Sequence, residues 1–177
     1  LFLQTLIICP KNLEQMWKYQ VEDYGLKARV LPISMVQKEL SKLRRYRLVL
    51  IDESHNLRNR VSKRYRAIRE YIEENECRVI LLSATPYNKT YLDLANQLRL
   101  FLDPEDDLGT RPERLIRELG MVEFNRKFES PPPNSLLSFE KSEHSGDWQE
   151  LMRLFMVRRT RSFIRENYAD DDEHGSY

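Results

Sequence analysis

The feature that most restricts how this chain can fold is a regular alternation of short apolar runs and longer amphipathic runs over about the first hundred of its 177 residues. Each short run has the length and continuous apolar character of a strand buried on both faces, and each longer run repeats its apolar residues at helical spacing. The short runs occupy residues 5–10, 28–33, 48–51 and 78–82, and the longer runs occupy residues 12–25, 34–43, 61–74 and 90–102. Parallel strands need a crossover between them, so the alternation predicts an α/β fold with a parallel, doubly wound sheet.

The pattern changes in the second part of the chain. Residues 112–120 predict a short helix, residues 147–167 predict a second helical stretch, and three successive prolines predict a loop over residues 130–138. We therefore expect an α/β lobe over residues 1–103 and a mostly helical appendage over residues 104–177 that ends in an acidic tail.

The composition narrows the class of protein without identifying it. The 29 Lys and Arg residues nearly balance the 28 Asp and Glu residues, so the overall charge carries no signature of a nucleic-acid binder. Cys9 and Cys77 have no neighbouring cysteine or histidine, which argues against a metal site and a disulfide framework. The apolar N-terminal run has neither the flanks of a signal peptide nor the length of a membrane span. We therefore expect a cytoplasmic protein that does not use a membrane.

Two adjacent carboxylates, Asp52 and Glu53, directly follow the apolar run at residues 48–51. Ligands of a doubly wound sheet bind beyond the carboxyl ends of its strands, which is where this pair would lie. Neighbouring side chains at a strand end point in different directions, so one can hold Mg²⁺, mostly through water, while the other activates an attacking water. Solvated carboxylates at a strand end are also common, and the pair alone leaves both interpretations open.

A second polar group follows the next apolar run. Ser83 and Thr85 end that run, and Pro86 comes directly after them. Their hydroxyls can hydrogen-bond the neighbouring loop that carries Asp52, or they can form a simple turn before the next helix. Because polar groups follow two consecutive strands, we favour a shared site.

The sequences of these segments resemble a known family. The segment "IDESH" resembles motif II of superfamily 2 helicases in its DExH form, and "SATP" resembles their motif III. The segment "TLIICPKNLEQMW" is similar to motif Ia of the Swi/Snf-type branch, and "LFMVRRTRSFI" is similar to the segment that closes the first motor lobe of that branch. The resemblance covers roughly residues 5–103 and 148–165, and it is weak over residues 104–147. The sequence "SAT", where eukaryotic chromatin remodellers commonly have "TGT", favours a prokaryotic member.

This resemblance implies a RecA-like (P-loop NTPase) fold and the first motor lobe of an ATP-dependent DNA helicase or translocase. Such a motor hydrolyses ATP with Mg²⁺, moves on DNA, and works with a second motor lobe of the same protein. By resemblance, Asp52 positions Mg²⁺, Glu53 activates water, and His55 links the nucleotide site to motif III. The coupling residues of motif III are Ser83, Ala84 and Thr85.

The same resemblance suggests where DNA is bound. Lys11 lies in the motif Ia turn, and Arg58 lies in the basic stretch after motif II. Both follow strands, so we expect both to reach the DNA backbone at the carboxyl edge of the sheet. Trp17 lies on the helix after Lys11, and we interpret it as a core residue and not as a platform for base stacking.

Two alternatives remain open from the sequence. The first is a strand-separating DExH helicase or the motor subunit of a restriction system, and a separation wedge in the second lobe would favour it. The second is a non-catalytic DNA-binding or interaction module with an ATPase fold. The absence of a phosphate loop from the full-length gene would favour this second alternative.

No Gly-rich phosphate loop occurs in the 177 residues, whose five glycines are scattered. In the family that the chain resembles, this loop lies just upstream of motif Ia, so we expect the chain to start after it. The loop supplies the backbone N–H groups and the lysine that bind phosphates. Without it, Asp52 and Glu53 offer negative charge to a negative ligand, and we expect this chain alone to be inactive on ATP.

Overall fold

The computed structural model describes residues 4–85 and 90–157, and its four strands form one parallel sheet. The strands are β1 (Thr5–Cys9), β2 (Ala28–Pro32), β3 (Leu48–Ile51) and β4 (Arg78–Leu81). They lie in the order β2-β1-β3-β4, and every neighbouring pair is parallel. Each strand falls on one of the four apolar runs, so the predicted parallel sheet is confirmed.

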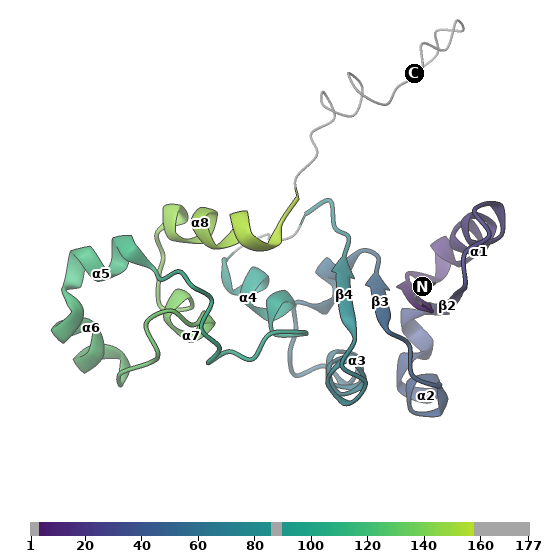
Figure 1. Ribbon diagram of the computed structural model, residues 1–177, viewed down its shortest axis with the longest axis horizontal. Coiled ribbons are helices and arrows are strands. Elements are labelled where there is room, and N and C mark those ends of the chain that lie inside the picture. Colours follow the sequence, from purple (N-terminus) through teal and green to yellow (C-terminus); the bar gives the residue numbers. More distant parts are fainter. Residues whose placement is uncertain (1–3, 86–89, 158–177) are drawn as a thin grey trace, which may run out of the picture.

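Helices cover both faces of this sheet (Figure 1). Helix α1 (Glu14–Asp23) lies on one face, and α2 (Val36–Glu39) and α3 (Lys63–Glu74) lie on the other. The chain winds from β1 outward to β2 and later from β3 outward to β4, in opposite directions along the sheet. Because crossovers are right-handed, helices on opposite faces follow, and the doubly wound prediction is confirmed. The winding changes direction between β1 and β3, whose carboxyl ends therefore flank the expected ligand crevice.

The main hydrophobic core lies between the sheet and helices α2 and α3. Alternate strand residues such as Leu6, Ile8 and Val49 face this core and are fully buried. From α3, Tyr65 packs into it and donates a hydrogen bond from its hydroxyl to the backbone oxygen of Asn96 at 2.7 Å. Burial raises the pKa of Tyr65 to about 12, so its hydroxyl stays protonated and remains a donor.

Two of the predicted helices are shorter than their sequence patterns. Residues 34–43 form only the four-residue α2, with a 3₁₀ turn on each side. So short a helix is not stable by itself, and the burial of Val36 and Leu40 in the core holds it in place. Helix α4 (Leu92–Leu98) ends four residues before the predicted position, where the buried Arg99 forms an ion pair with Glu140 at 2.6 Å.

Beyond α4 the chain forms a helical group that extends away from the sheet (Figure 1). Its helices are α5 (Glu113–Leu119), α6 (Met121–Phe128), α7 (Leu136–Phe139) and α8 (Ser145–Phe155). Helices α5 and α8 confirm the two predicted helical stretches, but α8 ends at Phe155, and Met156 after it has an extended backbone. Residues 158–167 of the second stretch lie outside the described part of the chain. Helix α6 was not predicted. The prediction of a loop over residues 130–138 is wrong for residues 136–138, which belong to α7. The three prolines lie before this helix and do not interrupt it.

The division of the chain at residue 103 stays a prediction. A second hydrophobic cluster joins α4 to α7 and α8, with Leu98, Phe139 and Trp148 among its buried members. Phe101 packs against both this cluster and the main core. Helix α4 therefore packs with the helices of the appendage, although its residues fall within the predicted lobe.

No helix in residues 4–85 and 90–157 combines the length and the apolar character needed to cross a membrane.

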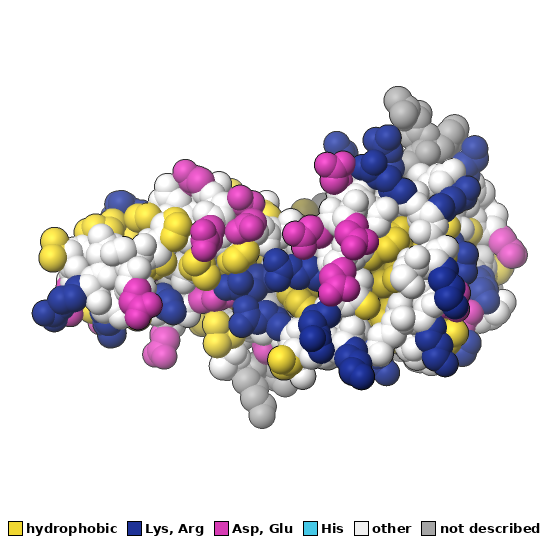
Figure 2. Space-filling view, turned by 90° about the horizontal axis from the view of Figure 1, so that it is seen from below, with side chains coloured by type: hydrophobic (Ala, Val, Ile, Leu, Met, Phe, Trp, Pro, Cys, Tyr) yellow, Lys and Arg dark blue, Asp and Glu magenta, His cyan; other side chains and the backbone are white. Residues whose placement is uncertain are grey.

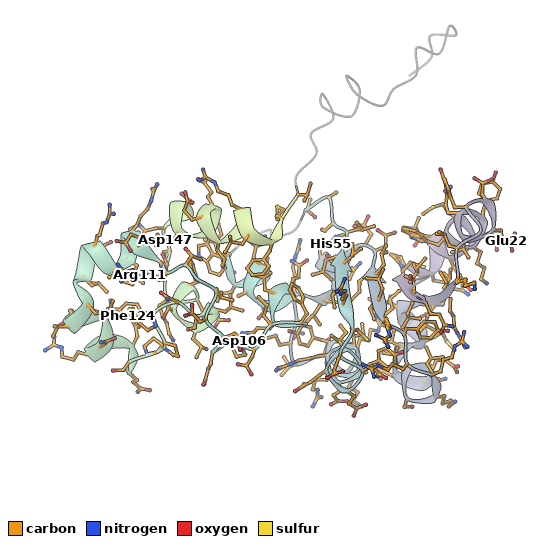
Figure 3. All side chains as sticks on the ribbon, in the orientation of Figure 1. Glu22, His55, Asp106, Arg111, Phe124 and Asp147 are labelled. Atoms are coloured by element: carbon orange, nitrogen blue, oxygen red, sulfur yellow. The ribbon has the colours of Figure 1, made fainter. Side chains whose placement is uncertain are left out.

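A buried carboxylate organises the appendage. Asp147, on α8, is 2 % exposed and accepts hydrogen bonds from the backbone N–H groups of Arg114 and Leu115 at 2.9 and 3.2 Å. The hydroxyl of Ser142 donates a third hydrogen bond to it at 2.6 Å. Figure 3 shows Asp147 where α8 passes the start of α5. This single side chain therefore satisfies two of the free N–H groups in the first turn of α5.

We predict that Asp147→Ala lowers the free energy of unfolding by about 2–3 kcal/mol, because it leaves buried donors without a partner. Chemical denaturation of the purified chain measures this. The control is Glu150→Ala, which removes an exposed carboxylate of the same helix that forms an ion pair with the exposed Arg153. We expect the control to change stability by no more than about 0.5 kcal/mol. Equal effects of both substitutions would contradict the role of Asp147.

Candidate functional site

The loop after β3 is fastened to both neighbouring strands. The backbone N–H of Asp52 donates to the oxygen of Ile8 at 2.8 Å, which extends the pairing with β1 by one residue. On the other side, the N–H of Ser54 donates to the oxygen of Leu82 at 2.9 Å, just after β4. The chain then forms a 3₁₀ turn over Ser54–Leu57. The loop is therefore fixed at the place where the winding of the sheet changes direction.

Glu53 has a left-handed backbone, with φ 51° and ψ 46°. This conformation costs an L-residue about 1–2 kcal/mol, so the surrounding hydrogen bonds must maintain it. The backbone N–H and the side-chain amide of Asn56 both donate to the oxygen of Glu53, at 2.9 and 3.0 Å. The turn separates the two carboxylates as the sequence predicted. Asp52 contacts α1, whereas Glu53 approaches His55.

Two neutral donors hold the Asp52 carboxylate. The indole Nε1 of Trp17 donates to Oδ2 at 2.8 Å, and the backbone N–H of Glu53 donates to Oδ1 at 2.9 Å. Each oxygen keeps a second lone pair. Within the described residues, no cluster of three or more His, Cys, Asp and Glu side chains could form a metal cage. A single carboxylate fits Mg²⁺, because this ion keeps several waters and takes further ligands from phosphates.

Cys9 lies at the end of β1 and is fully buried. Burial raises the pKa of its thiol to about 11, and the charges of Asp52 and Glu14 act in the same direction. The thiol therefore stays neutral at physiological pH and adds no charge beside Asp52.

His55 connects the two polar segments. Its Nδ1 lies 3.0 Å from Glu53 Oε2 and 3.3 Å from the hydroxyl oxygen of Ser83. The contact with Glu53 is close but poorly aligned, and this buried carboxylate oxygen accepts no well-formed hydrogen bond. The oxygen of Ser83 also accepts from the backbone N–H of Thr85 at 3.2 Å. The structure thus brings Glu53, His55 and Ser83 together. Figure 3 shows His55 beside β4.

The remaining members of the predicted motif III are at the surface. Ala84 and Thr85 are both exposed, and they end the described segment before residues 86–89. Thr85 is tied to the loop after β3 through its backbone oxygen, which accepts from Arg58 Nη2 at 2.5 Å. The roles of Ser83, Ala84 and Thr85 in coupling stay predictions.

Arg58 is mostly occupied within the molecule. Its side chain is 22 % exposed, and besides Thr85 it approaches Asp93 with Nε 3.7 Å from Oδ2. Its backbone oxygen accepts from the side chain of Asn96 at 2.7 Å. The geometry assigns Arg58 to holding the loop after β3 against motif III and α4. A contact of Arg58 with DNA stays a prediction.

Lys11 is exposed on the 3₁₀ turn Lys11–Leu13, directly beyond the end of β1. Its side chain is 74 % exposed and forms an ion pair with Glu14. Glu14 also pairs with Lys18 at 2.7 Å, and these two hydrogen-bonded lysines lower the pKa of the Glu14 carboxyl. Lys11 therefore lies at the predicted edge, within reach of a ligand in solvent.

Sequence reasoning missed a buried hydrogen bond that anchors the loop. The hydroxyl of Ser54, which is 1 % exposed, donates to Oε1 of the buried Gln97 on α4 at 2.8 Å. The only signal in the sequence is a small hydroxyl residue between charged neighbours. Sequence reasoning also missed the hydrogen bond from Trp17 to Asp52. Trp17 was expected in the core, but it is half-buried and donates its indole N–H to a carboxylate of the site.

We predict that Glu53→Gly gives a more stable protein than Glu53→Ala, by about 0.5–1 kcal/mol, because glycine adopts the left-handed backbone without steric cost. Urea denaturation of the two variants measures the difference. The matched control is the same pair of substitutions at Glu70, an exposed position inside α3. There the order should reverse by about 1 kcal/mol. The same order at both positions would contradict a strained turn at Glu53.

Comparisons with known proteins concern the family and the fold of this chain. The model of the SNF2-related domain family matches residues 29–176. Among solved structures, the Sulfolobus solfataricus SWI2/SNF2 ATPase core in complex with dsDNA is similar, with a TM-score of 0.55 and 18 % identity over 89 % of this chain. This chain covers 34 % of that structure. No match was found among the curated proteins. The structural likeness confirms the RecA-like fold, and the family match shows that the chain belongs to the SNF2-related domain family.

Proposed function

We propose that this chain is the first motor lobe of an ATPase that moves on duplex DNA, with Asp52 positioning Mg²⁺ and Glu53 activating the attacking water. One observation carries the proposal. The left-handed turn at Glu53 places two carboxylates with different surroundings at the change of winding in the sheet. The similar fold of an ATPase core whose structure contains dsDNA supports the choice of ligand.

The surroundings of the two carboxylates suit two different tasks. Phosphoryl transfer depends on positioned charge and an oriented nucleophile, and bound Mg-ATP supplies the reacting phosphate and the metal charge. Asp52 is held by N–H donors and keeps its own charge for the metal. The Glu53 side chain is 35 % exposed, so water can reach it. Its Oε2 faces His55, which leaves the other oxygen to accept a hydrogen bond from water.

The position of His55 supports a coupling role. Because its Nδ1 lies between Glu53 and Ser83, a movement of the segment after β4 changes the contact with Glu53. A movement of motif III can in this way change the position of the carboxylate proposed to activate water. A non-catalytic module would not need this connection between the two segments.

Exposed cations support the proposed DNA contact. Lys11 lies beyond β1, and the loop from β3 to α3 brings a second group of exposed cations to the same edge. This group consists of Arg60, Lys63 and Arg64. Figure 2, viewed from the side of α2 and α3, shows that Lys and Arg side chains are also frequent on that face of the molecule, with Asp and Glu side chains among them. Such charges bind phosphates without reading bases, as a motor moving over any sequence requires.

We predict that Glu53→Gln, in the natural gene product that contains this chain, lowers the rate of ATP hydrolysis by about 10²–10⁴-fold and leaves ATP binding in place. The substitution keeps the size of the side chain and removes its basicity. Steady-state turnover and nucleotide binding are measured together, with Glu70→Gln on the exposed side of α3 as the control. Hydrolysis within a few-fold of the parent rate would remove Glu53 from this role.

We predict that Lys11→Ala weakens duplex binding equally on two unrelated sequences and flattens the slope of log affinity against log salt by about 0.9. The matched control is Lys18→Ala. Lys18 pairs with the same Glu14 but lies about 10 Å further along α1, away from the edge. Binding is measured over a salt series with the natural gene product. An unchanged slope for Lys11→Ala, or an equal change for Lys18→Ala, would argue against a phosphate contact at Lys11.

A further inference from the structure

One hydrogen bond in the site joins two segments that are far apart in the sequence. Trp17 lies on α1, 35 residues before Asp52, and its indole N–H donates to Asp52 Oδ2 at 2.8 Å. Helix α1 packs against β1 and β2, whereas Asp52 follows β3. The bond therefore reaches across the end of β1.

The second donor to Asp52 cannot replace this connection. The N–H of Glu53 belongs to the next residue of the same loop, so that bond moves with the loop. Among the described hydrogen bonds of the carboxylate, only the one from Trp17 ties it to another element. Loss of the indole N–H would leave Oδ2 without a protein donor, and the carboxylate would then be held only by the N–H of Glu53 on its own loop.

The chemical character of the donor also matters. An indole has one N–H and no charge, so it fixes the orientation of a carboxylate without neutralising it. The two lysines nearest to Trp17 in the sequence are Lys11 and Lys18, and both form ion pairs with Glu14 instead. Asp52 forms no ion pair with any other residue in the described ranges, and its negative charge stays available to a cation.

We propose that Trp17 is a positioning residue that holds Asp52 in the orientation needed for Mg²⁺ and ties α1, the helix behind the Lys11 turn, to the metal-binding carboxylate. This inference rests on the proposed function. A displacement of the Lys11 turn on DNA is carried by α1 to Trp17 and from there to Asp52. The bond thus gives DNA contact a physical route to the nucleotide site.

The first test needs neither nucleotide nor DNA. The chain has two tryptophans, and the other one, Trp148, lies in the second hydrophobic cluster, where its indole donates to the backbone oxygen of Ser142 at 2.9 Å. In the ¹H–¹⁵N spectrum of the purified chain, Asp52→Ala should shift the Trp17 indole resonance and speed its hydrogen exchange. Asp52→Asn, which keeps a weaker acceptor, should have a smaller effect. The Trp148 resonance should stay in place in both variants.

The second test uses the natural gene product that contains this chain. Trp17→Phe keeps an aromatic ring and removes the N–H, and loss of an outer partner of a metal ligand should raise the Mg²⁺ concentration for half-maximal ATP hydrolysis roughly tenfold. The control, Trp148→Phe, loses an equivalent indole bond in the appendage. It should lower thermal stability without changing the Mg²⁺ requirement.

The outcomes separate this inference from the proposed function. An unmoved Trp17 resonance in Asp52→Ala would overturn the positioning role, whatever the hydrolysis measurements show. A lower melting temperature of Trp17→Phe with an unchanged Mg²⁺ requirement would overturn it as well, because Trp17 would then be structural. A parent protein that does not hydrolyse ATP would instead refute the proposed function, and a shifted resonance would still support the hold of Trp17 on Asp52.

Discussion

The left-handed backbone at Glu53 is the constraint on which the rest of the site depends. Hydrogen bonds to Ile8 on one side and to Leu82 on the other hold β3 and its extension in the sheet up to this residue. The chain cannot relax the turn without breaking the pairing of one of these strands. Because the turn persists, Asp52 faces α1 and Glu53 faces His55, and two adjacent residues acquire separate surroundings.

The same loop is attached to α4, and α4 belongs equally to the appendage. Ser54 binds Gln97 in the buried interior, and the backbone of Arg58 binds Asn96 one residue earlier on that helix. The opposite side of α4 packs Leu98 against Trp148 in the second cluster. A change at Ser54 or at the backbone of Arg58 therefore acts on a helix that also packs in the appendage, because one helix of seven residues serves both.

The sequence predicted what depends on local pattern and missed what depends on how elements pack. The four strands followed from runs of apolar residues, and the place of Asp52 at a carboxyl edge followed from the parallel topology. The short helix α7 was missed because the prolines before it dominate the local signal, although proline stops a helix only where it lies inside one. Trp17 was interpreted as core, since no local pattern shows that a half-buried indole will meet a carboxylate across the end of β1.

The distribution of charge around Asp52 gives the site its chemical preference. The two hydrogen-bond donors that hold this carboxylate are neutral, and the nearby thiol of Cys9 is kept protonated by burial and by the carboxylates near it. The surrounding cations are engaged elsewhere, Lys11 with Glu14 and Arg58 with Thr85 and Asp93. The end of β3 therefore keeps its negative charge, which attracts a divalent cation and repels a bare polyphosphate. In the proposed motor, a nucleotide would gain from this edge of the sheet only when it arrives with its metal, so the arrangement would favour Mg-ATP over free ATP.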